Sequence, residues 1–353
     1  MMSANSARAS AMLGQVAPGL MAALAAMLPA VLGGCGARER QVTVFTSLDR
    51  LYSEPLLAEF EKQHGCKVNA VYDIEASKTT GLVNRLLDEK GHPEADVFWN
   101  SEVGRTLQLQ QHGVLAPCQP ATAADIPAQF KDPQGYWYGF AARARVIIYN
   151  KELVPAREVP QSVLDLTKPK WRGKVTLGNP AFGTTATQMA ALWAHLGPQK
   201  AKAYFRALDE NGVVIVPGNA AVRDEVARGS CLLGLTDTDD VWAGVRRGKP
   251  VAMIYPDQGP GQMGTLVIPN TVCKIAGAPH PEQADELIEF LVSHDVETTL
   301  AYSDAHQMPV RPGVDKPPDV PELSGVKAMD VSFEAIAQAL EASGAYLREL
   351  FNR

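Results

Sequence analysis

The sequence predicts an α/β protein with two domains. Strand-like apolar segments, such as 41–46 and 67–72, alternate along the chain with segments that carry apolar residues at helical spacing, such as 51–63. This alternation indicates mostly parallel sheets covered by helices on both faces. Residues 36–353 are too many for one typical hydrophobic core and suit two. The content of 46% hydrophobic and 20% charged residues is typical of a globular protein.

The first half of the chain supplies three strand–helix units. The expected strands are 41–46, 67–72 and 95–99, and the expected helices are 51–63, 80–90 and 103–113. Each helical segment has one apolar face, which in 80–90 consists of Leu82, Val83, Leu86 and Leu87. Such faces are suited to packing against a sheet.

The second half repeats this pattern. The expected strands are 145–149, 173–177, 213–216, 231–235 and 251–255, and the expected helices are 184–196, 198–210, 220–228 and 282–292, followed by a helical region at 331–350. Two short strands, 266–268 and 272–275, are expected to return the chain to the first domain.

Residues 1–35 have the features of an export signal. Arg8 is the only charged residue before Cys35, and the apolar stretch 19–32 is too short to span a bilayer. The Leu-Gly-Gly-Cys ending at 32–35 resembles the lipobox of bacterial lipoproteins, in which cleavage leaves the cysteine as a lipid-modified first residue. We therefore expect a lipoprotein signal peptide and a mature chain anchored to the membrane on its periplasmic or cell-surface side. An ordinary cleaved signal with an incidental cysteine is the alternative.

Charge and motifs argue against several classes of protein. The net charge of −6 argues against nucleic-acid binding, which calls for a basic face. The seven histidines form no HExxH or similar metal-ligand pair, and the sequence has no GxSxG, P-loop or GxGxxG motif. We therefore expect a binding protein and not an enzyme. The four cysteines after Cys35 are Cys66, Cys118, Cys231 and Cys273, and their wide spacing disfavours a zinc site. The sequence is compatible either with a Cys66–Cys118 disulfide or with four buried free thiols.

Polar segments follow most of the expected strands. In open α/β sheets, ligands bind at the carboxyl ends of strands, where loops and helix N-termini converge. The segments are 46–49, 73–78, 100–102, 179–185, 217–220, 236–240 and 256–258. Their number predicts a polar binding site built from both domains.

Six segments, in their order and spacing, resemble the periplasmic ferric-iron-binding proteins of ABC importers, within the class of extracellular solute-binding proteins. They are VTVFTS at 42–47, ADVFW at 95–99, ARARVIIYN at 142–150, PKWRGKV at 169–175, GNPAFGT at 178–184 and APHPEQADELIEFL at 278–291. The resemblance covers nearly all of the chain after residue 35.

The resemblance implies a two-lobed clamp of the type II periplasmic-binding-protein fold, with hinge strands between the lobes. Lobe 1 would comprise 36–141 and 265–312, and lobe 2 would comprise 142–264 and 313–353. Closing two lobes over an ion removes water, so the site must supply polar groups in its place. The expected partners are a permease and an ATPase, and the receptor is expected to be a monomer.

The resemblance also implies a cation site, with one departure from the family. Members that bind Fe(III) commonly use two adjacent tyrosines of the second lobe, and Asp239 and Asp240 stand at that place here. Asp49 falls near a histidine of some relatives, and Glu102, or Ser101 beside it, falls near their carboxylate. The candidate metal or ammonium ligands are Asp49, Glu75, Glu102, Asp237, Asp239 and Asp240, with Asp257 as a further candidate. Carboxylates suit hard cations and organic ammonium groups alike.

Each acid also fits a local role. Asp239, Asp240 and Glu102 are placed to cap helices, where the dipole favours acids. Glu75 can pair with Lys78 at helical spacing, and Asp257 lies in a plausible turn sequence.

An anion site is expected beside the acids. Gly183, Thr184 and Thr185 open a helix, so that free N–H groups and hydroxyls meet at its positive end. Relatives hold a carbonate or phosphate partner of the iron there, with an asparagine that Asn219 matches, and Ser47 can add a hydroxyl. Ordinary N-capping explains Thr184 and Asn219 equally well.

The expected cargo is therefore iron as Fe3+ with carbonate or phosphate as a co-ligand. A small zwitterion such as 2-aminoethylphosphonate, or another hard metal cation, is the alternative, because acids next to an anion-binding helix end also suit a zwitterion.

Overall fold

The computed structural model describes residues 40–73 and 80–351, which fall within one structural unit, Glu39–Arg353. The expected signal peptide with Cys35, and the segment that contains Glu75, lie outside the described residues. No helix in the described ranges is long and apolar enough to cross a membrane.

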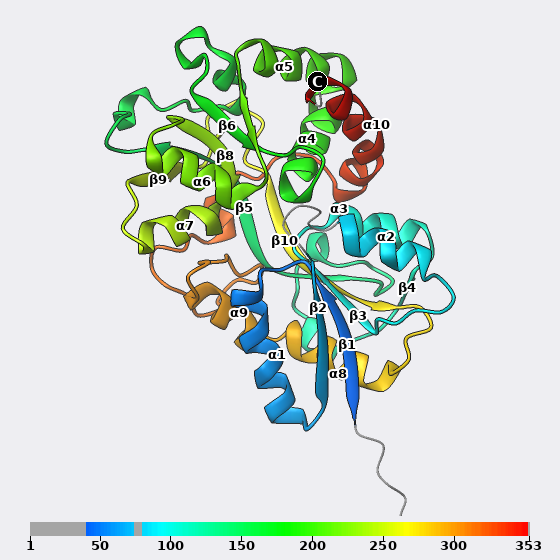
Figure 1. The fold of residues 1–353 in the computed structure, drawn as a ribbon. Coiled ribbons are helices and arrows are strands. Elements are labelled where there is room, and N and C mark those ends of the chain that lie inside the picture. Colours follow the sequence, from blue (N-terminus) through cyan, green and yellow to red (C-terminus); the bar gives the residue numbers. More distant parts are fainter. Residues whose placement is uncertain (1–39, 74–79, 352–353) are drawn as a thin grey trace, which may run out of the picture. The chain divides into compact units, whose positions relative to one another are not determined.

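Strands and helices alternate along the described chain (Figure 1). The first group is β1 (Gln41–Thr46), α1 (Arg50–His64), β2 (Lys67–Tyr72), α2 (Thr80–Asp88), β3 (Val97–Asn100), α3 (Gly104–Gln111) and β4 (Leu115–Ala116). The second group is β5 (Tyr138–Asn150), β6 (Val175–Gly178), α4 (Gly183–Leu196), α5 (Pro198–Glu210), β7 (Val214–Val216), α6 (Asn219–Arg228), β8 (Leu233–Asp237), α7 (Thr238–Arg246) and β9 (Val251–Ile254).

The chain then passes through β10 (Val267–Ile275), α8 (Pro281–Leu291) and α9 (His294–Tyr302), and ends in α10 (Phe333–Phe351). Short 3-10 helices occupy Ala121–Ala123, Ala128–Phe130, Ala156–Glu158, Val163–Thr167, Pro169–Trp171 and Leu323–Gly325.

Two long strands join two groups of parallel strands into one curled sheet. The strand order is β2-β1-β3-β10-β5-β8-β6-β7, with β4 paired to β10 and β9 paired to β5. β1 is parallel to β2 and β3, and β6 is parallel to β7 and β8, whereas β5 and β10 pair antiparallel with each other (Figure 1). The fold is therefore the two-lobed α/β clamp that the sequence predicts, with β5 and β10 as connecting strands.

The ladder between β5 and β10 is irregular where it passes from one group to the other. Its register shifts between Pro269 and Asn270, opposite Ala141, which has a positive φ of 43°. The Ala141 N–H donates to the buried carboxylate of Glu297 at 2.8 Å, so α9 holds this irregular point in place. The irregularity explains why the sequence suggested two strands at 266–268 and 272–275, because Pro269 interrupts the strand pattern of what is one bulged strand.

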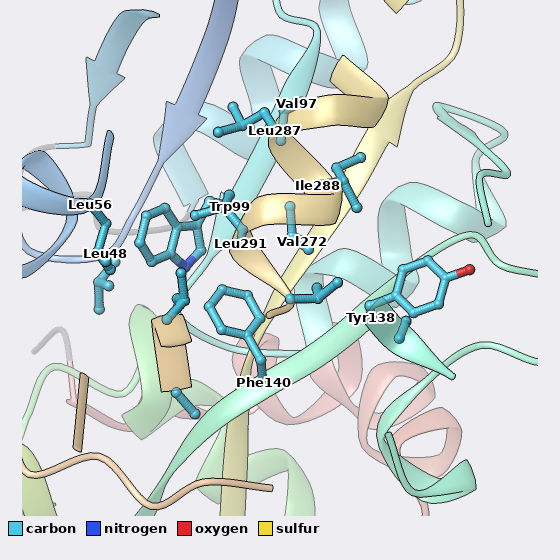
Figure 2. Packing of buried hydrophobic residues seen from close by; sticks show 14 of the residues in the cluster. Leu48, Leu56, Val97, Trp99, Tyr138, Phe140, Val272, Leu287, Ile288 and Leu291 are labelled. Carbon is cyan, nitrogen blue, oxygen red and sulfur yellow. The ribbon is translucent and has the colours of Figure 1, made fainter. Parts of the chain in front are cut away.

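Separate hydrophobic clusters support the two groups of strands. Trp99 on β3 is fully buried, and its ring centroid lies 5.7 Å from that of Phe140 on β5, beside Leu287 and Leu291 of α8 (Figure 2). A second cluster packs α4, α5 and α10 against β6 and β8. Burying each such apolar side chain contributes about 1.5–3 kcal/mol to the stability of the folded state. The strands and helices that carry the loops are therefore held firmly in place.

The structure departs from the expected elements at a few places. β5 begins at Tyr138, before the expected 145, because its first half is buried on both faces and lacks alternation. α9 was not predicted, and Cys66, Cys118, Cys231 and Cys273 are buried free thiols, so the Cys66–Cys118 disulfide is not formed.

Candidate solute-binding site

A cleft with about 630 Å³ of empty space lies at the carboxyl ends of β6 and β8 and the N-termini of α4, α6 and α7. Segments on both sides of the connecting strands line it. The lining residues that the sequence predicted are Asp49, Gly183, Thr184, Thr185, Asn219, Asp237, Asp239 and Asp240. Ser101, Arg143, Asn179 and Phe182 also line it. The structure thus brings four of the expected acids and the expected helix end into one cavity.

The N-terminus of α4 offers backbone donors to the cleft. The first intrahelical bond of α4 runs from the Ala186 N–H to the Phe182 carbonyl at 3.1 Å, so the N–H groups of residues 183–185 precede the helical ladder. Gly183 has a φ of 54°, a conformation that favours glycine. A helix end of this kind stabilises a negative charge.

A buried ion pair lies directly behind this helix end. Arg145 on β5 is fully buried and faces Asp237 in the β5–β8 ladder, where its Nη1 donates to Asp237 Oδ1 at 2.8 Å. The other carboxylate oxygen, Oδ2, accepts from Thr184 Oγ1 at 2.5 Å and from Asn219 Nδ2 at 2.8 Å. Asp237, Thr184 and Asn219 therefore form one network with Arg145, and both oxygens of Asp237 are engaged within the protein.

A second buried arginine stands beside Asp239. Arg143 is 2% exposed, and its Nε lies 3.1 Å from Asp239 Oδ2. Its Nη1 donates to the Ser101 carbonyl after β3, and its Nη2 donates to Asn270 Oδ1 on β10 at 2.7 Å. One guanidinium thus links α7, β10 and the loop after β3. Paired charges are the usual way in which a protein tolerates a buried cation.

Asp239 and Asp240 occupy the first turn of α7, and Asp237 is its N-cap residue without a side-chain capping bond. One carboxylate oxygen from each of the three can lie within 4.8 Å of the others, close enough to share a metal ion. Thr236 Oγ1 donates to Asp240 Oδ2 at 3.2 Å. The helix position of Asp239 and Asp240 matches the capping interpretation, and their place in the cleft matches the ligand interpretation. Both Asp239 oxygens already have partners within the protein, because Oδ1 accepts from the Asp240 N–H at 3.1 Å and Oδ2 lies beside Arg143 Nε.

A smaller side cavity adjoins the cleft across Asp49, Ala220, Asp239 and Asp240, which line both. Tyr52, in the first turn of α1, lines this side cavity. Burial, followed by the charge of Asp239, raises the pKa of the Tyr52 phenol. Arg223 and Arg247 also line this side cavity.

Two predicted residues lie away from the cleft. Ser47 is 2% exposed, and its hydroxyl donates to Asn100 Oδ1 at 2.8 Å, behind the cleft wall. Glu102 is 1% exposed and accepts from the Gly104 and Arg105 N–H groups at the start of α3 and from Thr187 Oγ1 on α4. Burial raises the pKa of the Glu102 carboxyl. Glu102 therefore caps α3 and ties it to α4.

Asp257 also lies elsewhere. Its carboxylate accepts from the Val163 N–H at 3.1 Å, and its positive φ of 61° places it in a turn. Burial raises the pKa of this carboxyl.

The sequence analysis missed Arg143 and Arg145. The signal was present, because two arginines one residue apart lie within the apolar run 138–150. Arginines are buried on a sheet face only when carboxylates or carbonyl groups accept hydrogen bonds from them. The pattern therefore indicates a polar interior at the site.

A two-lobed α/β fold with a polar cleft at its strand ends defines a solute-binding protein. The family model of the bacterial extracellular solute-binding proteins matches residues 93–339, and the chain belongs to this family. It is accordingly a transport protein that acts in the periplasm or outside the cell.

Individual relatives agree with this family. The chain is 26% identical to iron uptake protein A1 of Synechocystis over 321 residues, which cover 88% of this chain and 87% of the relative. It is 26% identical to a putative 2-aminoethylphosphonate-binding periplasmic protein of Salmonella typhimurium, with 74% of this chain and 77% of the relative covered. The crystal structure of iron-bound HitA from Pseudomonas aeruginosa has the same fold, with a TM-score of 0.79 at 20% identity over 88% of this chain and 99% of HitA.

Proposed function

We propose that this protein is the receptor of an ABC importer and that its cargo is iron as Fe3+. The carboxylates of Asp49, Asp239 and Asp240 would hold the ion, and the N-terminus of α4 would hold a carbonate or phosphate on it. The observation that carries the proposal is the cleft itself, in which these acids face a helix end that has free N–H groups. Hard oxygen donors suit a hard cation.

The similarity to iron uptake protein A1 of Synechocystis supports iron as the cargo. The match covers 88% of this chain and 87% of that relative, and the relative is named for iron uptake. Lobe 1 would comprise 36–141 and 265–312, and lobe 2 would comprise 142–264 and 313–353, with the cation and the anion held between them. A permease and an ATPase would take the cargo from the closed form of a monomeric receptor.

Asp237 takes no part in the proposed ion site. Both its oxygens accept hydrogen bonds from Arg145, Thr184 and Asn219. A metal would have to displace those donors and leave Arg145 buried beside a cation, which is costly. The proposed protein ligands are therefore the more exposed acids Asp49, Asp239 and Asp240, and binding at Asp239 would also require its pair with Arg143 to loosen.

A zwitterion is the second candidate, favoured by one observation. Arg143 and Arg145 offset two of the three aspartates at 237–240, so the cleft is less negative than the sequence alone indicates. An ammonium group needs less negative charge than Fe3+ does. The Salmonella relative is named for such a compound, 2-aminoethylphosphonate.

A thermal-shift titration distinguishes the candidates. The metal-stripped protein is melted with Fe(III)-citrate, with and without bicarbonate or phosphate, and with Fe(II), Mn(II), Ca(II) or 2-aminoethylphosphonate. A ligand that binds only the folded form raises the melting temperature. At a ligand concentration of a hundred times Kd, it stabilises the folded form by about 2.7 kcal/mol. A shift with iron that increases with the anion supports the proposal. A shift with the aminophosphonate and none with metals overturns it in favour of the zwitterion.

Matched variants assign any shift to the cleft. Asp240→Asn should abolish the shift with iron. Glu282→Gln is the control, because Glu282 is an exposed acid in the first turn of α8, outside the cleft lining. Equal loss in both variants would show that the shift reports non-specific metal binding.

We also propose that Cys35 carries a lipid anchor. The supporting feature is the apolar stretch that ends in Leu-Gly-Gly-Cys at 32–35. Cys35→Ser should leave the protein unlipidated by mass spectrometry and release it from the membrane fraction. A wild-type protein whose mature N-terminus lies elsewhere would contradict the proposal.

A further inference from the structure

Two buried amide side chains lie at the irregular point of the ladder between β5 and β10. Asn270 and Gln307 are fully buried, and Asn270 directly follows the register shift in β10. Asn270 Nδ2 donates to the Ala141 carbonyl at 2.5 Å and to Gln307 Oε1 at 2.8 Å. The next residue, Met308, pairs with Ala142 of β5 through two backbone hydrogen bonds. The two amides therefore fasten the bulge in β10 to β5 and to the segment after α9.

Arg143 connects this bulge to the cleft. Its Nη2 donates to Asn270 Oδ1 at 2.7 Å, and its Nε lies 3.1 Å from Asp239 Oδ2. Arg143 and Asp239 both line the cleft. A short chain of contacts thus runs from a carboxylate in the cleft, through one guanidinium, to the place where the two connecting strands change register.

This chain of contacts contains two donors that are not fully bonded. Among the described residues, Arg143 Nε and Gln307 Nε2 are buried nitrogen atoms without a hydrogen-bond acceptor, and Arg143 Nε has only its ion-pair contact with Asp239. A buried donor without an acceptor costs free energy. A rearrangement that supplies an acceptor regains that free energy, so two arrangements of these side chains can lie close in energy.

We propose that Arg143 is a positioning residue that couples the charge at Asp239 to the geometry of the connecting strands. The inference rests on the proposed function only in that a cation binds at Asp239, which holds for Fe3+ and for an ammonium group alike. Such a cation competes with Arg143 for the carboxylate and loosens their pair.

The remaining contacts of Arg143 carry this change to the strands. Its guanidinium keeps two acceptors, the Ser101 carbonyl after β3 and Asn270 Oδ1 on β10. A shift of the guanidinium therefore moves Asn270 and the bulge that Asn270 fastens to β5. Because β5 and β10 join the two groups of strands, the orientation of one group relative to the other changes with the charge at Asp239.

A distance measurement without cargo tests this coupling. Asp239→Asn imitates the neutralised carboxylate, because asparagine keeps the size of the side chain and removes its charge. Spin labels at Lys62→Cys on α1 and Lys200→Cys on α5, both exposed positions, report the distance between the two groups of strands by pulsed electron paramagnetic resonance. The cysteines of the described chain are buried thiols, and Cys35→Ser removes the fifth cysteine of the sequence.

The metal-stripped, labelled protein is measured with and without Asp239→Asn in three backgrounds. The first is otherwise wild type, and the second carries Asn270→Ala, which removes the acceptor of Arg143 Nη2. The third carries Asn150→Ala as the matched control. Asn150 is a buried amide of β5 whose Nδ2 donates to the Val226 carbonyl at 2.9 Å, away from the bulge.

We expect Asp239→Asn to shift the distance distribution in the wild-type and Asn150→Ala backgrounds and to have no effect in the Asn270→Ala background. No shift in the wild-type background, or a shift that persists with Asn270→Ala, overturns the inference. If Asn270→Ala melts abnormally, Arg143→Lys replaces it, because lysine keeps the buried charge but lacks the planar fork that reaches separate acceptors. The shift should then be lost as well, and its persistence would overturn the inference.

The same labelled proteins separate this inference from the proposed cargo. The measurements above need no cargo, so their outcome does not depend on iron. Adding Fe(III)-citrate with bicarbonate to the wild-type background should move the distribution in the same direction as Asp239→Asn. If the protein binds no iron, the proposed cargo fails and the coupling stands on the cargo-free result. If iron binds and the distribution moves in the opposite direction, the coupling fails and the cargo stands.

Discussion

Replacing Asp237 by asparagine separates a structural acid from a ligand-binding one. Asp237 is 3% exposed and accepts from Arg145, which is fully buried, at 2.8 Å. Asparagine keeps the size of the side chain but removes its charge. The buried guanidinium then loses its counter-ion, whereas the neutral partners Thr184 and Asn219 remain in place.

The expected cost follows from these contacts. Breaking a buried ion pair by removing one partner costs about 3–5 kcal/mol. Arg145 keeps neutral acceptors, Gln188 Oε1 at 2.9 Å and the Leu235 carbonyl at 3.4 Å, so the lower end of that range applies. We expect Asp237→Asn to lower the free energy of unfolding by about 3 kcal/mol, a large share of the 5–15 kcal/mol typical of a folded domain.

Equilibrium urea unfolding, followed by circular dichroism without cargo, measures this cost. Asp240→Asn is the comparison, because Asp240 is less buried than Asp237; it should stay within about 1 kcal/mol of wild type. Adding Arg145→Met to Asp237→Asn should recover part of the loss, since the unpaired cation is then gone. A loss below about 1 kcal/mol in Asp237→Asn, or no recovery in the double variant, would refute the reasoning.

Three further predictions follow from the site. Asp240→Ala should abolish the thermal shift with iron while the melting temperature without iron stays near normal, and a large loss of stability with intact binding would favour a capping role. Asp239→Ala should reduce both binding and stability, because it leaves Arg143 buried and unpaired, and unchanged stability would contradict that pair. Burial raises the pKa of Glu102 above its ordinary 4.5, so the folded state holds a proton that the unfolded chain releases. The stability of wild type relative to Glu102→Gln should therefore fall as pH rises above about 4.5, and a pH-independent difference would contradict it.

The sequence predicted most elements because their signals are local. Helical spacing of apolar residues located α2 and α5, and strand alternation located β1 and β2 within a residue or two. The rule that ligands bind at strand ends selected five segments that do line the cleft, 46–49, 100–102, 179–185, 217–220 and 236–240, and one that does not, 256–258. These inferences need no knowledge of distant partners.

The polar interior of the site could not be predicted in this way. Arg145 meets Asp237 only through the register of β5 against β8, and Glu102 meets Thr187 across α3 and α4. Nothing local distinguishes an acid that accepts from a buried arginine from one that faces solvent. The sequence analysis therefore predicted the same ligand role for Asp237, Glu102 and Asp240, and only the packing distinguishes them.

If the cargo is iron, the same packing predicts that its binding depends on an anion that binds with it. Arg145 sits behind Thr184 at the N-terminus of α4, and Arg143 sits beside Asp239, so cations flank the acids on the anion side of the cleft. A bare Fe3+ would meet both positive groups and the positive helix end at once. A carbonate or phosphate placed there would neutralise them and add oxygen donors to the ion.

Titrating bicarbonate or phosphate at fixed iron concentration checks this dependence. The apparent Kd for iron should fall as the anion concentration rises and then level off when the anion site is filled, and by linkage iron should tighten anion binding by the same factor. Thr185→Val, which removes one hydroxyl from the anion side, should weaken the anion dependence while iron binding at saturating anion persists. An iron affinity that does not change with the anion concentration would mean that the carboxylates alone satisfy Fe3+, and that the buried arginines only hold the strands and helices around the cleft in place.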